Sequence, residues 1–210
     1  MLAPKWILLS IMVSMASLGY SAPKFQCLDS RISRTDARYA TFYRALQLIR
    51  ERKAQVIIET GTARGGGLDC TGDGCFTLIL AGWVKENGGQ FYSVDISEGA
   101  LLMAGKGLKE LKKFVHLIQR DSVEFLANFN QPIDFLYLDS YDYEKDNPYP
   151  SQLHQLREIQ AAMPLLTEKS VVMLDDCNLP EGGKCKLTID YLLGLGWKII
   201  HRNYQIIFIK

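Results

Sequence analysis

Two adjacent carboxylates, Asp175 and Asp176, follow the hydrophobic run SVVML at residues 170–174. Two such charges roughly 4 Å apart repel by about 4 kcal/mol at an effective dielectric constant near 20. Backbone N–H groups, a shared proton or a cation could offset this repulsion. The sequence therefore predicts a compensating group at the end of a buried strand.

Other residues capable of chemistry also follow apolar runs. QVIIE leads into TGTARGGG, whose glycines let the backbone approach a ligand closely. QFYSVD ends in Asp95, which could accept hydrogen bonds from both hydroxyls of a ribose or could cap the next helix. VHLIQ precedes Asp121, which could cap a short helix together with Glu124 or face an adenine amino group. These residues indicate a nucleotide-like ligand.

The elements that must position these residues alternate along the chain. Continuous apolar strands alternating with helices are typical of a parallel sheet covered on both faces. Strands are expected at residues 55–59, 90–95, 115–119, 133–139 and 170–174, and helices at 35–53, 76–87, 98–111, 122–129, 151–163 and 187–196. In such a sheet, ligands bind beyond the carboxyl ends of the strands.

The end of the chain departs from this alternation. Two apolar runs, at residues 197–201 and 204–210, are separated by Arg202 and Asn203 alone. So short a link can only join antiparallel strands. The sequence therefore predicts a mostly parallel sheet that ends in an antiparallel hairpin.

In this order and at strand ends, the motifs ETGTARGGG, VDIS, RDS and LYLDSYDY resemble the cofactor motifs of class I S-adenosylmethionine (SAM) dependent methyltransferases. The hairpin is similar to the antiparallel seventh strand of that fold. The resemblance implies an α/β fold, a Rossmann-like, doubly wound sheet of seven strands. It also implies SAM as the cofactor, bound by Glu59, Gly61, Thr62, Gly65, Asp95, Asp121 and Ser122.

The resemblance also suggests a metal site. Asp139 ends the fourth strand, which in this fold lies beside the fifth, so Asp139 is expected to face Asp175 and Asp176. This arrangement is similar to the metal site of catechol and macrocin type O-methyltransferases. Three carboxylates would suit a divalent cation such as Mg²⁺, which would lower the pKa of an acceptor hydroxyl. Two alternatives stay open, namely aspartates that only cap turns and Asp139 acting as a base without metal.

The candidate catalytic residues are Asp139, Asp142 and His154. The catechol enzymes carry a lysine three residues after the strand-four acid, and this chain has Asp142 there. Asp142 could be a ligand, a base or a solvated loop residue. His154 could serve as a base or could be structural. The tyrosines of the loop at residues 140–150 could form an aromatic substrate wall or an ordinary packed loop.

The expected oxidation state of the five cysteines depends on the cellular compartment of the protein. In an exported domain, local bridges Cys70–Cys75 and Cys177–Cys185 could pin two loops and leave Cys27 unpaired. In the cytoplasm the same residues would be free thiols. The spacings fit no common zinc pattern.

The composition and the N-terminal segment predict the number of domains, the partners and the location of the protein. The chain has 210 residues, 48% of them hydrophobic, and a net charge of +1, which predicts one domain at 23–210 and indicates no nucleic-acid partner. Residues 1–22 resemble a signal peptide, which would make the protein periplasmic or secreted. The alternative is a membrane anchor with a cytoplasmic domain. The methyltransferase family also suggests a homodimer through the first helix.

The predicted function is that of a SAM-dependent O-methyltransferase, which would act on a hydroxyl of a small molecule or sugar with a divalent cation. A nicotinamide-dependent oxidoreductase is one alternative, although Ala63 replaces the second glycine of its GxGxxG pattern. A secreted, non-catalytic binding module that keeps the fold is the other alternative.

Overall fold

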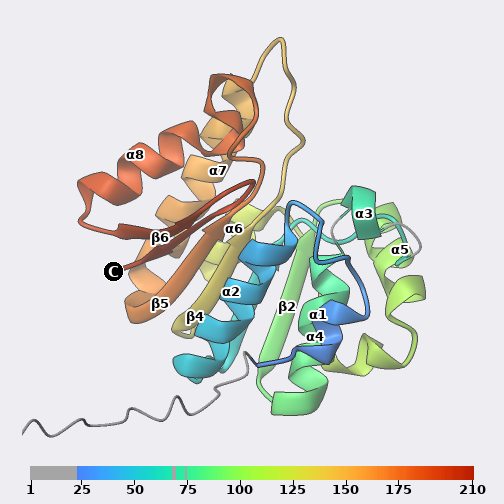
Figure 1. Ribbon diagram of the computed structural model, residues 1–210. Coiled ribbons are helices and arrows are strands. Elements are labelled where there is room, and N and C mark those ends of the chain that lie inside the picture. Colours follow the sequence, from blue (N-terminus) through green and yellow to red (C-terminus); the bar gives the residue numbers. More distant parts are fainter. Residues whose placement is uncertain (1–22, 68–69, 74) are drawn as a thin grey trace, which may run out of the picture.

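One seven-stranded sheet forms the centre of the computed structural model, which describes residues 23–67, 70–73 and 75–210 (Figure 1). The predicted signal peptide or anchor at residues 1–22 lies outside the described residues. The strands are β1 (Val56–Thr60), β2 (Gln90–Asp95), β3 (His116–Gln119), β4 (Ile133–Leu138), β5 (Leu166–Leu174), β6 (Lys198–Arg202) and β7 (Ile206–Ile209). They lie in the order β3-β2-β1-β4-β5-β7-β6.

The strand directions confirm the predicted fold. β1 to β5 are parallel, whereas β7 is antiparallel to both β5 and β6. The strand order reverses between β1 and β4, and in doubly wound sheets this is where a crevice opens at the carboxyl ends. Asp95, Asp139 and Asp175 all lie at those ends.

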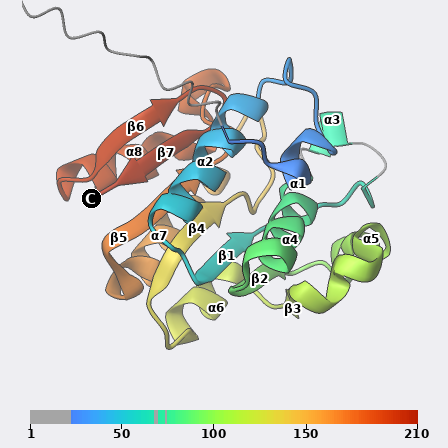
Figure 2. The same cartoon turned by 60° about the horizontal axis from the view of Figure 1, so that its bottom comes forward.

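Helices cover both faces of the sheet, as Figures 1 and 2 show. The helices α1 (Gln26–Asp29), α2 (Tyr39–Glu51) and α4 (Phe76–Asn87) pack in one hydrophobic cluster, and α6 (Ser122–Asn128), α7 (Tyr149–Ala162) and α8 (Lys186–Gly194) in the other. Neighbouring residues of β1 alternate between the clusters, Ile57 facing the first and Ile58 the second. Both faces are therefore buried, which explains the continuous apolar strands.

Several boundaries differ from the sequence predictions. The first long helix begins at Tyr39 rather than Thr35, because the Asp36 carboxylate accepts a hydrogen bond from the Arg38 N–H and closes a turn before it. α5 (Glu98–Leu108) gives way to a 3-10 segment, Lys109–Phe114. The short helices α1 and α3 (Cys70–Asp73) and the 3-10 segments Met163–Leu165 and Pro180–Cys185 were not predicted. No helix in the described ranges has both the length and the apolarity needed to cross a membrane.

Gly61 allows the chain to turn sharply at the end of β1. Its φ is +79°, and a Cβ placed there would lie 2.4 Å from the carbonyl oxygen of Asp139. A side chain at position 61 would collide with the backbone of Asp139, so glycine is needed here whether or not a ligand binds. We expect Gly61→Ala to lower the free energy of unfolding by about 1–3 kcal/mol through backbone strain and overpacking.

Chemical denaturation of Gly61→Ala beside Gly194→Ala tests this expectation. Gly194 lies in α8, where an added Cβ meets no atom within 4 Å. That control is expected to leave stability unchanged or raise it by up to about 1 kcal/mol. Equal stabilities for the two variants would contradict the assigned role of Gly61.

Candidate active site

A cavity of about 580 Å³ opens at the carboxyl ends of the parallel strands. Its volume lies in the range of small-molecule sites, about 300–1,000 Å³. Six of the seven predicted cofactor residues line it, namely Glu59, Gly61, Thr62, Asp95, Asp121 and Ser122. The predicted catalytic residues Asp139, Asp142 and His154 line it too, together with Asp175 and Asp176. Gly65, which the structure describes, is not among its lining residues.

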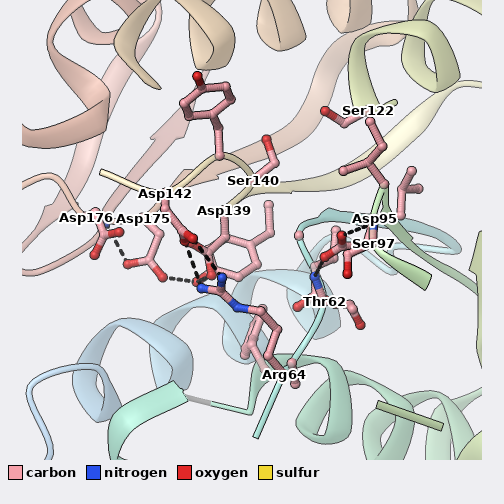
Figure 3. Close-up of a pocket in the computed structure, with 18 of the residues that line it drawn as sticks. Thr62, Arg64, Asp95, Ser97, Ser122, Asp139, Ser140, Asp142, Asp175 and Asp176 are labelled. Atoms are coloured by element: carbon pink, nitrogen blue, oxygen red, sulfur yellow. Dashed lines mark hydrogen bonds and ion pairs between the residues drawn. The ribbon is translucent and has the colours of Figure 1, made fainter. Parts of the chain in front are cut away.

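Asp95 organises one half of the cavity (Figure 3). One carboxylate oxygen accepts a hydrogen bond from the Thr62 N–H at 3.0 Å, and the other accepts one from the Ser97 N–H at 2.8 Å. The cap of α5 is Ser97, whose hydroxyl oxygen accepts from the Ala100 N–H, and not Asp95. Each oxygen of Asp95 keeps a lone pair for a further donor. This carboxylate therefore fits the hydroxyls of a ribose.

Glu59 stabilises the glycine turn after β1 through a network of hydrogen bonds. Its side chain is buried, and one carboxylate oxygen accepts hydrogen bonds of 2.7 Å from the hydroxyls of both Thr77 and Ser93. The Thr77 hydroxyl in turn accepts from the Ala63 N–H at 2.9 Å. This network fixes the backbone at the end of β1, which is where the methionine part of SAM is expected.

Asp121 begins α6, as the sequence predicted. Its carboxylate accepts from the Glu124 N–H at 2.9 Å, while the Glu124 side chain pairs with Arg120 rather than completing a capping box. The next residue, Ser122, lies 3.0 Å from the Nε2 atom of His154. Asp121 and Ser122 therefore stand at the cavity wall beside α7.

Asp139, Asp175 and Asp176 converge at the opposite half, as expected of neighbouring strand ends (Figure 3). The hydroxyl of Tyr137 donates to Asp175 and, at 3.3 Å, to Asp139. The hydroxyl of Tyr204, in the loop between β6 and β7, donates to Asp176. The Asp176 N–H also donates to Asp175 at 2.7 Å. Hydrogen-bond donors thus already contact each of the three carboxylates.

The cation in this cluster is a lysine. The Nζ atom of Lys184 lies 2.8 Å from Asp139 Oδ1 and 3.0 Å from Asp176 Oδ2, and its side chain is only 2% exposed. Burial lowers the pKa of Lys184, but the charges of Asp139, Asp176 and Asp175 outweigh it and raise the pKa above its ordinary value. Direct contact with two carboxylates therefore favours the ammonium form of Lys184.

This arrangement does not fit the predicted divalent cation. The oxygens that Asp139 and Asp176 turn toward each other are bonded to the same ammonium group. A divalent ion at that point would meet a positive charge at close range. Among residues 23–67, 70–73 and 75–210, no group of three or more histidine, cysteine or acidic side chains forms a metal site. The predicted ligands Asp139, Asp175 and Asp176 thus lie together, but Asp139 and Asp176 share an ammonium ion.

The carboxyls of Asp139 and Asp175 hold protons more tightly than usual. Burial raises the pKa of Asp139, and the charge of Asp176 adds to it against the opposing effect of Lys184. Burial, with the charges of Asp139 and Asp176, raises the pKa of Asp175 well above its ordinary value. A carboxylate with a raised pKa is a better proton acceptor.

Asp142 is a poor candidate for the base. It accepts two hydrogen bonds from the guanidinium of Arg64, at 2.8 and 2.9 Å, and both side chains line the cavity (Figure 3). These bonds hold the pKa of Asp142 below its ordinary value. The side chain is also 70% exposed. A salt bridge at the rim explains this residue better than catalysis does.

His154 lies on the cofactor side of the cavity. Burial lowers its pKa, but Glu158, whose carboxylate is 3.6 Å from Nε2, outweighs this effect and raises the pKa. The imidazole also contacts Ser122 and the ring of Tyr141, whose centroid is 5.2 Å away. These contacts favour a structural role for His154 in the wall.

The structure contains both of the disulfides that were considered for an exported domain. Cys70–Cys75 closes the loop before α4, and Cys177–Cys185 closes the loop after β5. Cys27 is unpaired, as that pairing implies, and it is buried. Cys185, one half of the second bridge, is the residue directly after Lys184. The bridge therefore helps to hold Lys184 against the carboxylates.

Some cavity residues were not identified from the sequence. Arg38 and Phe76 line the cavity, and the Arg38 guanidinium lies 4.7 Å from the centre of the Tyr204 ring. Ser97 and Ile96 line the cofactor side, the latter 70% exposed. Ser97 could have been found from its position just before a helical pattern, because serine is a preferred helix cap. No local pattern marks Arg38 or Tyr204, nor Lys184, which contacts the carboxylates without lining the cavity.

The comparisons with known proteins agree with this geometry. A family model described as a methyltransferase domain matches residues 71–177, about half of the chain. This chain belongs to that methyltransferase family. The matched segment contains the strand ends that carry Asp95, Asp139 and Asp175. Among curated proteins, none matches the sequence.

Several solved structures share the fold at low identity. NSun6 from Pyrococcus horikoshii has a TM-score of 0.57 at 20% identity, covering 79% of this chain and 50% of its own. The TDP-rhamnose 3′-O-methyltransferase CalS11 has a TM-score of 0.55 at 17% identity, over 81% of this chain and 78% of its own. The SAH-bound methyltransferase PaMTH1 from Podospora anserina has a TM-score of 0.57 at 12% identity, over 88% and 84%. The chain spans only half the length of NSun6.

Proposed function

We propose that this methyltransferase transfers a methyl group from SAM to a hydroxyl group of a small molecule or sugar. The observation that carries the proposal is the place of Asp139, whose raised-pKa carboxylate lines the same cavity as Asp95 and Gly61. A proton acceptor beside a cofactor site is what an acceptor hydroxyl needs, because the neutral oxygen is a weak nucleophile.

The two halves of the cavity have different tasks. Asp95 would accept hydrogen bonds from the ribose, and the turn from Gly61 to Ala63 would hold the methionine part. SAM, when bound, supplies an electrophilic methyl group on its sulfonium. Asp139 would take the proton of the acceptor hydroxyl, and the cavity walls would hold the oxygen in line with that methyl group.

The acceptor side supports a polar ring as substrate. The aromatic side chains of Phe76 and Tyr204 line the cavity together with the carboxylates, and the Arg38 guanidinium lies over the Tyr204 ring, 4.7 Å from its centre. Burial lowers the pKa of Arg38, but nearby acidic groups, Asp175 first among them, outweigh it and raise the pKa. The divalent cation expected from the sequence has no place in this proposal, because Lys184 occupies the position between the carboxylates. Family membership favours methyl transfer over the alternative of hydride transfer.

Incubation with SAM carrying a trideuterated methyl group tests the proposal. Small molecules that offer hydroxyl, amine or thiol groups are supplied, and mass spectrometry with NMR locates the label. We expect an O–CD₃ product, with sugars and phenols preferred. Labelling confined to nitrogen or sulfur would contradict the O-specific assignment while keeping SAM as the cofactor.

The cofactor half makes a separate prediction. Asp95→Asn removes the charge that would hold the ribose, at a cost of about 1.5–3 kcal/mol, so the dissociation constant of S-adenosylhomocysteine (SAH) is expected to rise about 10- to 100-fold. Calorimetric titration measures it. Glu98→Gln, the same change of charge on an exposed acid of the first turn of α5, is the control and should bind SAH normally. Equal affinities for both variants would refute the role of Asp95.

A further inference from the structure

The segment that carries Lys184 is shaped to deliver it into the acidic cluster. Gly183 has a φ of +59°, and a Cβ there would lie 1.7 Å from the carbonyl oxygen of Asp176. Only glycine therefore lets the backbone pass so close to the strand end. The Lys184 N–H donates to that same carbonyl oxygen at 3.2 Å. Backbone and side chain of Lys184 thus both contact Asp176.

Two further contacts hold this segment in place. The Gln152 side-chain amide, on α7, donates to the carbonyl oxygens of Glu181 and Gly183 at 3.1 and 3.0 Å. The Cys177–Cys185 disulfide ties the residue after Lys184 to the residue after Asp176. Fixing a long, flexible lysine side chain costs up to about 2 kcal/mol of conformational entropy. The Gln152 hydrogen bonds and the disulfide hold the backbone beside Lys184 and so offset that cost.

The position of Lys184 relative to the cavity is specific. Its ammonium group lies behind the carboxylates, because Asp139, Asp175 and Asp176 line the cavity and Lys184 does not. An acceptor molecule therefore meets the carboxylates and not the lysine. The ammonium group can neutralise and orient Asp139, but it cannot bind the acceptor oxygen as a metal ion would.

We propose that the buried ammonium group of Lys184 takes the place of a divalent cation in this site, and that it positions Asp139 as the proton acceptor. The inference rests on the proposed function in one respect, the role of Asp139 in catalysis. Lys184 is a positioning residue, which acts through Asp139 and Asp176. The enzyme then needs no added metal, and metal and lysine exclude one another.

Removing the ammonium group should turn the cluster into a metal site. In Lys184→Met, oxygens of Asp139 and Asp176 face each other without a cation, together with Asp175, and carboxylate oxygens are preferred ligands of Mn²⁺ and Mg²⁺. We expect the full-length variant to bind Mn²⁺ at least about tenfold more tightly than the wild-type chain, since the opposing positive charge is gone. Calorimetric titration with MnCl₂ measures this directly and requires no turnover.

Two variants make the assignment specific. Lys184→Arg keeps the positive charge and is expected to bind Mn²⁺ as weakly as the wild type. Lys184→Met combined with Asp176→Asn keeps the vacancy but loses a ligand, so the gained affinity should disappear. Lys184→Gln is a second neutral variant in case the methionine variant does not fold. SAH binding by each variant reports whether the cofactor half is intact.

Activity gives a second readout. Wild-type turnover should be unchanged by EDTA, whereas Lys184→Met should be slow without metal and faster with Mn²⁺. Wild-type Mn²⁺ binding that Asp176→Asn abolishes would overturn the proposal. So would a folded, SAH-binding neutral variant that gains no Mn²⁺ affinity. A wild-type chain that binds no SAH would instead sink the proposed function, which separates the two failures.

Discussion

Asp139→Asn is expected to lower kcat by about 10²- to 10⁴-fold, the usual contribution of a general base, while SAH affinity changes less than about twofold. Asparagine keeps the size of the side chain but cannot take the proton of the acceptor hydroxyl. The cofactor half, around Asp95, is built on other loops and should be unaffected. Steady-state kinetics with the acceptor found by methyl labelling, and SAH calorimetry, measure both quantities.

The other two catalytic candidates provide the comparison. Asp142→Asn breaks an exposed pair with Arg64, worth at most about 1 kcal/mol, so kcat should fall only a few-fold. His154→Asn should mainly raise the SAH dissociation constant, because His154 contacts Ser122. A large kcat loss in either variant, with Asp139→Asn nearly as active as the wild type, would move the base to that residue.

Replacing both Cys177 and Cys185 by serine is expected to have the second large effect. Loss of a short-range bridge should reduce the free energy of unfolding by about 2–3 kcal/mol. It should also release Lys184 from the cluster and lower kcat, because the bridge adjoins the lysine. Chemical denaturation and kinetics measure the two effects.

Amine acetylation followed by mass spectrometry shows where the lysine is. Lys184, 2% exposed and protonated, should resist acetylation in the wild-type chain and react in the double serine variant. The matched control replaces Cys70 and Cys75 by serine, which opens the other disulfide loop. That control should leave Lys184 protected. Equal protection of Lys184 in all three proteins would contradict the positioning role of the Cys177–Cys185 bridge.

The fold could be predicted because its signals are local. Continuous apolar runs indicated buried parallel strands, and the two-residue link after His201 could only give an antiparallel pair. The carboxylates of Asp95, Asp139 and Asp175 come directly after such runs, so a parallel sheet must bring them to one edge. The candidate cavity therefore lies where the sequence predicted it.

The group that compensates the acids could not be predicted in the same way. Lys184 is 45 residues from Asp139 and reaches it only through a glycine turn and a disulfide, neither of which marks a lysine as buried. The chemistry of three carboxylates equally suits a divalent cation and an ammonium ion. Likewise, the partner of Asp142 could not be predicted, because Arg64 lies 78 residues away in the sequence.

The central claim is that the strand ends around Asp95 and Gly61 bind the methyl donor of this family. Calorimetric titration of the full-length chain with SAH, once in EDTA and once in MgCl₂, tests it most directly, with NAD as the control ligand. The account predicts one site per chain with micromolar affinity for SAH, the same in both buffers, and no binding of NAD. A folded chain that binds neither ligand would contradict the claim and favour a binding module that keeps the fold without the chemistry.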